Sequence, residues 1–160
     1  MHQSQLKEAF RPNRSDRHAG TAGDSHVPPV PSPDLGELVL IRGLPGSGKS
    51  TMAKEMVANG FVHFEADMFF TVDGTYAYNP VRIQEAHAWC QRMTRQALKE
   101  GRRVVVSNTF TRLREMEPYQ CMVDRIRVLE ACGRWQNTHG VPAEMVDRMA
   151  QRWERLPPKD

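Results

Sequence analysis

The sequence is poor in cysteine and contains no long hydrophobic run. Its three cysteines, Cys90, Cys121 and Cys132, are odd in number and far apart, with no Cys-x-x-Cys pair. This pattern excludes a disulfide-stapled scaffold and predicts reduced thiols. No apolar segment is long enough for a signal peptide core or a membrane span, and acidic residues near the N-terminus are atypical of an organellar transit peptide. We therefore predict a cytoplasmic protein with no membrane partner.

An excess of one charge is also missing. The chain has 22 basic and 19 acidic residues, which gives a net charge of +3. This balance excludes the large positive field that dominates nonspecific nucleic-acid binding. It permits a polyanionic substrate without requiring one.

Aliphatic periodicity is missing from residues 1–36. This stretch holds five of the eleven prolines and scattered charges, so we predict a disordered proline-rich tail. We assign residues 37–157 to one compact domain.

Residues 43–50, GLPGSGKS, carry the strongest motif of the sequence. They match Gly, four free positions, Gly, Lys, then Ser or Thr, the pattern of a phosphate-binding loop (P-loop). An apolar strand is predicted before the loop, over 37–42, and a helix after it, over 50–58. Glycines allow positive φ angles that turn successive N–H groups toward phosphate oxygens, and the helix N-terminus adds its positive end.

The P-loop predicts ATP and Mg²⁺ as cofactors. Lys49 is placed to reach the β- and γ-phosphates, and the Ser50 hydroxyl is a candidate ligand of Mg²⁺. Thr51 packs or caps the helix in this interpretation. The predicted nucleotide-binding residues are Gly43, Pro45, Gly46, Ser47, Gly48, Lys49, Ser50 and Thr51.

Asp67 follows a second predicted strand over 61–65. Ligands of open α/β sheets lie at the carboxyl ends of strands, where a carboxylate can accept the proton of an attacking hydroxyl. We predict this catalytic role for Asp67, with an N-cap or a salt bridge as the alternative. The aromatic-rich segment 68–79 either lines an acceptor pocket or closes over a core, and its pocket candidates are Phe69, Tyr76 and Tyr78.

Helices and strands alternate through the rest of the chain. We predict an amphipathic helix, a buried strand, a helix interrupted near Pro118, a fourth strand and a last helix, over 81–100, 102–107, 112–123, 126–130 and 142–155. The alternation predicts an α/β fold of the P-loop NTPase type, with a parallel sheet of about four or five strands flanked by helices.

Three further residues are candidates for the site. Asn108 ends the third strand, where a P-loop enzyme usually carries an acidic Mg²⁺ partner. It can orient a metal-bound water but contributes no charge. Arg134 and Arg148 are candidate charge stabilisers in and after a mobile loop that closes over ATP, and we select Arg134 as catalytic together with Lys49 and Asp67.

Residues 38–155 resemble the polynucleotide-kinase-like group of P-loop kinases, which includes the phage-type polynucleotide 5′-kinase and related ATP-binding proteins. The resemblance rests on motifs in a fixed order: GLPGSGKST, FEADMFF, SNTF, EMEPY, and NTHGVP followed by RMAQRWE. It implies ATP bound by the P-loop residues, Asp67 as the acid that activates the acceptor hydroxyl, and a lid at NTHGVP.

The sequence departs from that group at three points. Phe70 stands where the phage-type enzyme has an arginine, Asn108 stands where an acid is expected, and Arg134 is only the nearest substitute for the lid arginines. Our first hypothesis is an ATP- and Mg²⁺-dependent kinase with a hydroxyl acceptor, with a polynucleotide 5′-OH as one candidate. The alternatives are a kinase of a small hydroxyl metabolite and a nucleotide-binding regulatory module with little transfer activity.

Overall fold

The computed structural model describes residues 36–134 and 140–159. The predicted tail therefore lies outside the described residues, apart from Gly36. Half of the lid-like NTHGVP stretch, residues 137–139, also lies outside them.

Four parallel strands form the central sheet, in the order β2-β5-β1-β6. The strands are β1 (Leu38–Arg42), β2 (Val62–Phe64), β5 (Val104–Asn108) and β6 (Ile126–Glu130). Every residue of the two central strands, β1 and β5, is buried. Burial on both faces explains why these strands read as continuous apolar runs and not as an alternating pattern.

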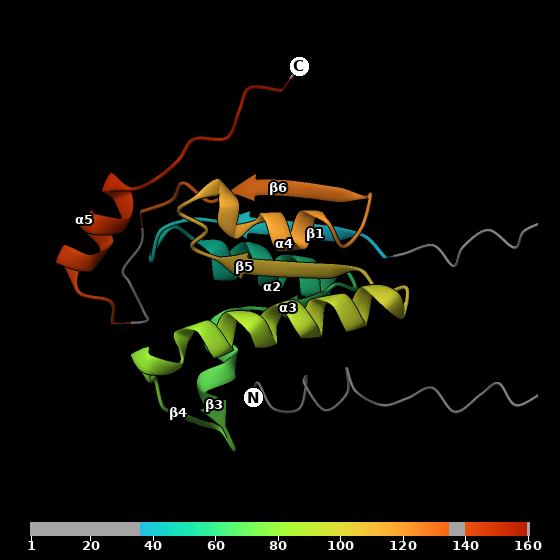
Figure 1. Ribbon diagram of the computed structural model, residues 1–160, viewed down its shortest axis with the longest axis horizontal. Coiled ribbons are helices and arrows are strands. Elements are labelled where there is room, and N and C mark those ends of the chain that lie inside the picture. The colour runs from blue at the N-terminus through green and yellow to red at the C-terminus, as the bar shows by residue number, and fades with distance from the viewer. Residues whose placement is uncertain (1–35, 135–139, 160) are drawn as a thin grey trace, which may run out of the picture.

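Helices cover both faces of the sheet. Helix α2 (Lys49–Ala58) lies on one face, where its Ala53 packs in a cluster with Val39, Ile41 and Val105. Helix α3 (Ile83–Lys99) and the short α4 (Glu117–Gln120) contribute to the core on the other face (Figure 1). The predicted parallel, helix-covered sheet is confirmed.

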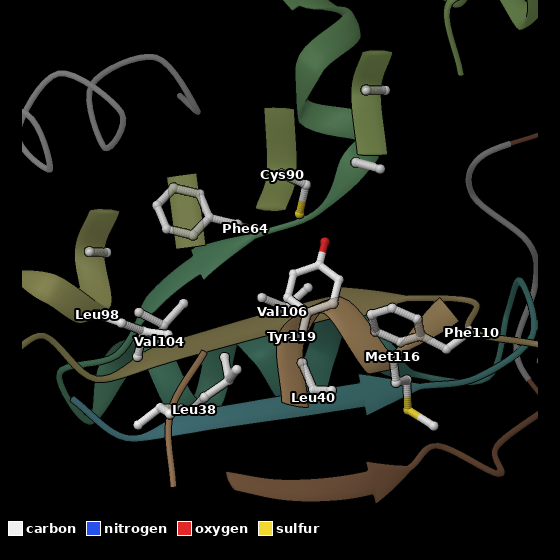
Figure 2. Packing of buried hydrophobic residues seen from close by; sticks show 14 of the residues in the cluster. Leu38, Leu40, Phe64, Cys90, Leu98, Val104, Val106, Phe110, Met116 and Tyr119 are labelled. Atoms are coloured by element: carbon white, nitrogen blue, oxygen red, sulfur yellow. The ribbon is translucent and has the colours of Figure 1, made fainter. Parts of the chain in front are cut away.

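The larger core lies on the α3 and α4 side of the sheet. Along β1 and β5, the residues of this core alternate with the residues that face α2. The other residues of the core include the buried side chains of α3 and Tyr119 of α4 (Figure 2). The Tyr119 hydroxyl points toward the Cys90 thiol in the middle of this core. The labelled members include Leu38, Leu40, Phe64, Cys90, Leu98, Val104, Val106, Met116 and Tyr119.

The segment between β2 and α3 contains structure that the sequence did not reveal. A 3₁₀ turn, η1 (Ala66–Phe70), leads into a hairpin of β3 (Thr71–Val72) and β4 (Thr75–Tyr76). Its turn has positive φ at Asp73 (50°) and Gly74 (79°). A second 3₁₀ turn, η2 (Pro80–Arg82), precedes α3, so the helix itself begins later than predicted.

Two other predicted helices are wrong in extent. The segment predicted as one interrupted helix over 112–123 forms a 3₁₀ turn, η3 (Leu113–Glu115), and then α4, because Pro118 stands in the first turn of α4 and cannot continue a preceding helix. The last helix, α5 (Ala143–Gln151), ends earlier than predicted. Beyond it the Glu154 amide donates to the Thr111 carbonyl at 2.8 Å. Helix α5 lies past the carboxyl ends of the strands (Figure 1).

Candidate active site

The P-loop joins β1 to α2 through two glycines with positive φ. Gly46 has φ 81° and Gly48 has φ 95°. Gly48 is also the N-cap of α2, and no side chain caps the helix there. The first turn of α2 therefore presents backbone N–H groups without a side-chain partner, the arrangement that binds phosphate at helix N-termini.

Gly43 is required for a different reason from the one predicted. It is not among the positive-φ glycines, but a Cβ on it would lie 2.2 Å from Ser47 Oγ. Close packing within the loop, and not a bend, therefore selects glycine at this position. The Ser47 hydroxyl is buried and has no hydrogen-bond partner among the described residues. A buried polar group without a partner fits a loop that binds an anion.

Lys49, the first residue of α2, carries its ammonium group into the site. Its Nζ donates to the Leu44 carbonyl at 3.4 Å across the loop. Burial lowers the pKa of Lys49, while the charges of Glu65 and Asp67 act in the opposite direction. Both carboxylates therefore lie within electrostatic reach of the P-loop lysine. Ser50 is half-buried beside it, and Thr51 is exposed, so Thr51 does not pack inward.

Asp67 lies in η1, just past the carboxyl end of β2. Tyr76 of the β3–β4 hairpin donates from its hydroxyl to Asp67 Oδ1 at 2.7 Å. Partial burial and this hydrogen bond raise the pKa of Tyr76, so its hydroxyl stays protonated at neutral pH and remains a donor. Of the three aromatic candidates, Tyr76 is the one that a hydrogen bond ties to Asp67.

The other two aromatic candidates pack against neighbouring rings. Phe69 lies against Phe70 and Trp89, with ring centroids 5.4 and 6.2 Å away, and so belongs to the core side of the segment. Tyr78 contacts Phe70 edge-on at 5.1 Å but is 53% exposed. Tyr76 and Tyr78 therefore give an aromatic surface near Asp67, and Phe70, which contacts both Tyr78 and Phe69, lies between Tyr78 and the core.

A polar chain that the sequence analysis missed lies beside Lys49. Ser107 Oγ donates to Glu65 Oε2 at 3.1 Å, and His63 Nε2 lies 2.6 Å from the same Ser107 oxygen. His63 and Glu65 are two residues apart in the predicted strand 61–65, a spacing that predicts both side chains on one face. In the structure β2 ends at Phe64, and the extended Glu65 follows it. The two-residue spacing of His63 and Glu65 was therefore the sequence feature from which this pair could have been predicted.

Asn108 does not reach the P-loop side of the sheet. Its Oδ1 accepts from the Ala66 amide at 3.0 Å, and its Nδ2 faces the Cys90 sulfur at 3.9 Å. The side-chain amide of Asn108 therefore contacts η1 and α3. The role predicted for Asn108, orienting a metal-bound water, does not agree with this placement.

The segment after β6 runs along the P-loop. The Ala131 amide donates to the Arg42 carbonyl at 2.8 Å, and the Gly133 amide donates to the Ser47 carbonyl at 2.9 Å. Arg134 is exposed and directly follows Gly133, so its backbone is anchored next to the loop. Arg148 is exposed on α5.

The part of the chain that the structure describes contains neither a membrane-spanning helix nor a dedicated metal site. No helix in that part of the chain is long and apolar enough to cross a membrane. Nor do three His, Cys, Asp or Glu side chains gather anywhere in residues 36–134 and 140–159 as a dedicated metal site. The Ser50 hydroxyl and the Glu65 and Asp67 carboxylates still fit Mg²⁺, because this ion takes few protein oxygens and completes its shell with phosphate and water.

Comparison with known proteins identifies the family. Residues 38–156 match the family described as "AAA domain". The chain belongs to this family. The AAA domain is 32% identical over 135 residues to NEDD4-binding protein 2 of Homo sapiens, covering 74% of this chain and 8% of that protein. It is 30% identical over 131 residues to an uncharacterized protein of Pasteurella multocida (strain Pm70), covering 70% of this chain and 73% of that protein. The chain thus spans only a small part of the human relative.

Solved structures share the fold of this AAA domain. A chain of the Pnkp1/Rnl/Hen1 RNA repair complex matches with a TM-score of 0.52 at 20% identity, over 78% of this chain and 41% of that chain. A gluconokinase from Sinorhizobium meliloti 1021 matches with a TM-score of 0.54 at 15% identity, over 76% of this chain and 77% of that chain. The fold is that of a P-loop NTPase with a four-stranded parallel sheet flanked by helices, as predicted.

Proposed function

We propose that this AAA domain is an ATP- and Mg²⁺-dependent kinase that transfers the γ-phosphoryl group to a hydroxyl acceptor. The observation that carries the proposal is the meeting of three groups at one end of the sheet. These are the P-loop with its buried, unpartnered Ser47 hydroxyl, the partly buried Lys49, and the Asp67 carboxylate within electrostatic reach of that lysine.

Each residue has a defined part in the transfer. The P-loop N–H groups and Lys49 bind the phosphates of ATP and stabilise charge that develops during transfer. Mg²⁺, bound with the help of Ser50, would neutralise charge on the β- and γ-phosphate oxygens. The acceptor oxygen forms a bond to the γ-phosphorus, the bond to the β–γ bridging oxygen breaks with its electron pair going to ADP, and Asp67 takes the acceptor proton.

The hydrogen bond from Tyr76 supports this role of Asp67. The Tyr76 hydroxyl donates to the Asp67 carboxylate at 2.7 Å, and Tyr76 is 51% exposed. An acceptor hydroxyl that displaces the phenol would make the same contact. The carboxylate is therefore accessible to an O–H donor from the solvent side, as proton removal requires.

Two acceptor classes remain in the proposal, and the aromatic surface favours one. Tyr76 and Tyr78 are half-exposed rings near Asp67, and rings of this kind stack on nucleobases. A polynucleotide 5′-OH is therefore the first acceptor to test, and the fold shared with a chain of an RNA repair complex agrees with it. A small hydroxyl metabolite is the second, since a gluconokinase also shares the fold.

The test is transfer of labelled γ-phosphate from Mg²⁺-ATP to 5′-hydroxyl DNA and RNA oligonucleotides, nucleosides and small sugars. We expect Lys49→Met and Asp67→Asn to lower transfer by at least 100-fold. Asp124→Asn is the matched control, because Asp124 is exposed just before β6, at the opposite end of the sheet. Full activity in Asp67→Asn would refute the catalytic role. ATP binding without transfer to any acceptor would favour a regulatory module.

A further inference from the structure

The end of β5 lacks the acid that a P-loop enzyme commonly uses on the magnesium side of its site. This strand ends with Ser107 and Asn108 and is followed by Thr109. Asn108 faces η1 and α3, as its contacts with Ala66 and Cys90 show. The P-loop side of this strand end therefore carries the hydroxyl of Ser107 and no carboxylate of its own.

The register of the sheet places Ser107 on the α2 face. Ser107 pairs with Ile41, and His63 pairs with Val105. Ile41 and Val105 both belong to the cluster that packs against Ala53 of α2. Because residues two apart in a strand share a face, His63 and Ser107 lie on the side of the sheet from which α2 and the P-loop rise.

The hydrogen bonds around Ser107 have one consistent direction. The hydroxyl has a single hydrogen, and it donates this to Glu65 Oε2 at 3.1 Å. It must then accept from His63 Nε2 at 2.6 Å, so that nitrogen carries a hydrogen. In a hydrolytic triad the imidazole stands between serine and acid. Here the serine stands in the middle and is 2% exposed, so the three residues orient a carboxylate and do not activate a nucleophile.

We infer that Glu65, held by Ser107 and His63 directly after β2, supplies the carboxylate on the magnesium side of the P-loop. The end of β5 carries no such carboxylate. Glu65 would then be a positioning residue that holds the hydrated Mg²⁺ in place, while Asp67 would serve the acceptor. The electrostatic effect of Glu65 on Lys49 agrees with this location. The inference rests on the proposed ATP- and Mg²⁺-dependent function.

The experiment compares ATP affinity in Mg²⁺ with ATP affinity in EDTA, by isothermal titration calorimetry. We expect Glu65→Gln to weaken binding in Mg²⁺ by about 10-fold, as loss of an outer-sphere metal partner does. Binding in EDTA should be unchanged or tighter, because a negative charge near the phosphates is gone. Glu37→Gln is the matched control, since Glu37 pairs with Arg103 and Arg127 just before β1, at the opposite end of the sheet.

A second pair of variants separates positioning from folding. Ser107→Ala should shift binding in the same direction by a smaller factor. Exchange of the two groups, Glu65→Ser with Ser107→Asp, keeps a hydroxyl and a carboxylate in contact and moves the acid to β5, so it should restore most of the Mg²⁺-dependent affinity. Thermal unfolding without nucleotide confirms that each variant is folded.

The outcomes are distinct. Equal losses in Mg²⁺ and in EDTA, or no loss in folded Glu65→Gln, would overturn the inference and leave the proposed function intact. Wild-type protein that binds no ATP in either condition would overturn the proposed function itself.

Discussion

At the scale of single residues, burial separates the three cysteines. Cys90 lies in the core and is fully buried, whereas Cys121 and Cys132 are exposed. Burial raises the pKa of Cys90 to about 11. The thiolate is the reactive form of cysteine, so Cys90 is almost entirely in its unreactive thiol form at pH 8, and the core shields it as well.

We therefore predict two fast thiols and one slow one. Titration with Ellman's reagent at pH 8 should label Cys121 and Cys132 rapidly, and Cys90 only after denaturant is added. Because the pKa of Cys90 lies above that of a free thiol, its labelling should accelerate as the pH rises toward 11. Cys90→Ser is the control that removes the slow phase. Three equally fast thiols in native protein would contradict the packing of this core.

The sequence predicts the position of Arg42 but not its structural role. Arg42 ends an apolar strand, and the neighbouring residues predict only that strand. Its guanidinium is fully buried and donates to the carbonyls of Phe110, Thr111 and Glu154 at 2.8 to 3.3 Å. These acceptors lie at least 68 positions away, so no local pattern points to them.

Among the elements, Arg42 connects the segment after α5 to β1, the strand that leads into the P-loop. The Trp153 ring stacks on the guanidinium, with its centroid 4.0 Å from Cζ. Arg152 Nε adds a hydrogen bond to Thr111 Oγ1 at 3.2 Å, and the Leu113 amide donates to Glu154 Oε2 at 2.8 Å. The last described segment thereby closes over the carboxyl end of β1.

We expect this attachment to contribute measurably to stability. Arg42→Met should lower the free energy of unfolding by about 3 kcal/mol, because it leaves buried carbonyls without donors. Trp153→Ala should lower it by about 2 kcal/mol through lost packing and cation–π contact. Arg42→Lys should lower the free energy of unfolding nearly as much as Arg42→Met, since an ammonium lacks the planar fork that reaches several carbonyls. Urea unfolding measures all three, with exposed Met145→Ala as the control within about 0.5 kcal/mol.

Sequence predicted the elements with strong local signals and missed those that depend on distant contacts. The runs LVLI and VVV gave the two central strands, and GLPGSGKS gave the loop and the helix after it. The β3–β4 hairpin was not predicted because each of its strands has only two residues, too few for an alternation of apolar and polar residues to be recognised. For Ser107 the sequence predicts only a strand position, because its hydrogen bond to Glu65 joins β5 to the residue that follows β2.

At the scale of the whole molecule, the P-loop should make the stability of the domain depend on nucleotide. A ligand that binds only the folded state adds about 2.7 kcal/mol at 100 times its dissociation constant. For a domain of about 120 residues that corresponds to an increase in melting temperature of roughly 10 °C. The kinase and the regulatory module share this expectation, because both bind ATP.

Lys49→Met tests whether the stabilisation comes from the P-loop. Lys49 Nζ makes a long hydrogen bond to the Leu44 carbonyl, at 3.4 Å, so loss of this contact should leave the melting temperature without nucleotide within about 2 °C of wild type. The increase caused by Mg²⁺-ATP should be largely lost, because the ammonium that binds the phosphates is gone. Differential scanning fluorimetry with and without Mg²⁺-ATP measures both values. If the variant keeps the full nucleotide-dependent increase, ATP binds somewhere other than this loop.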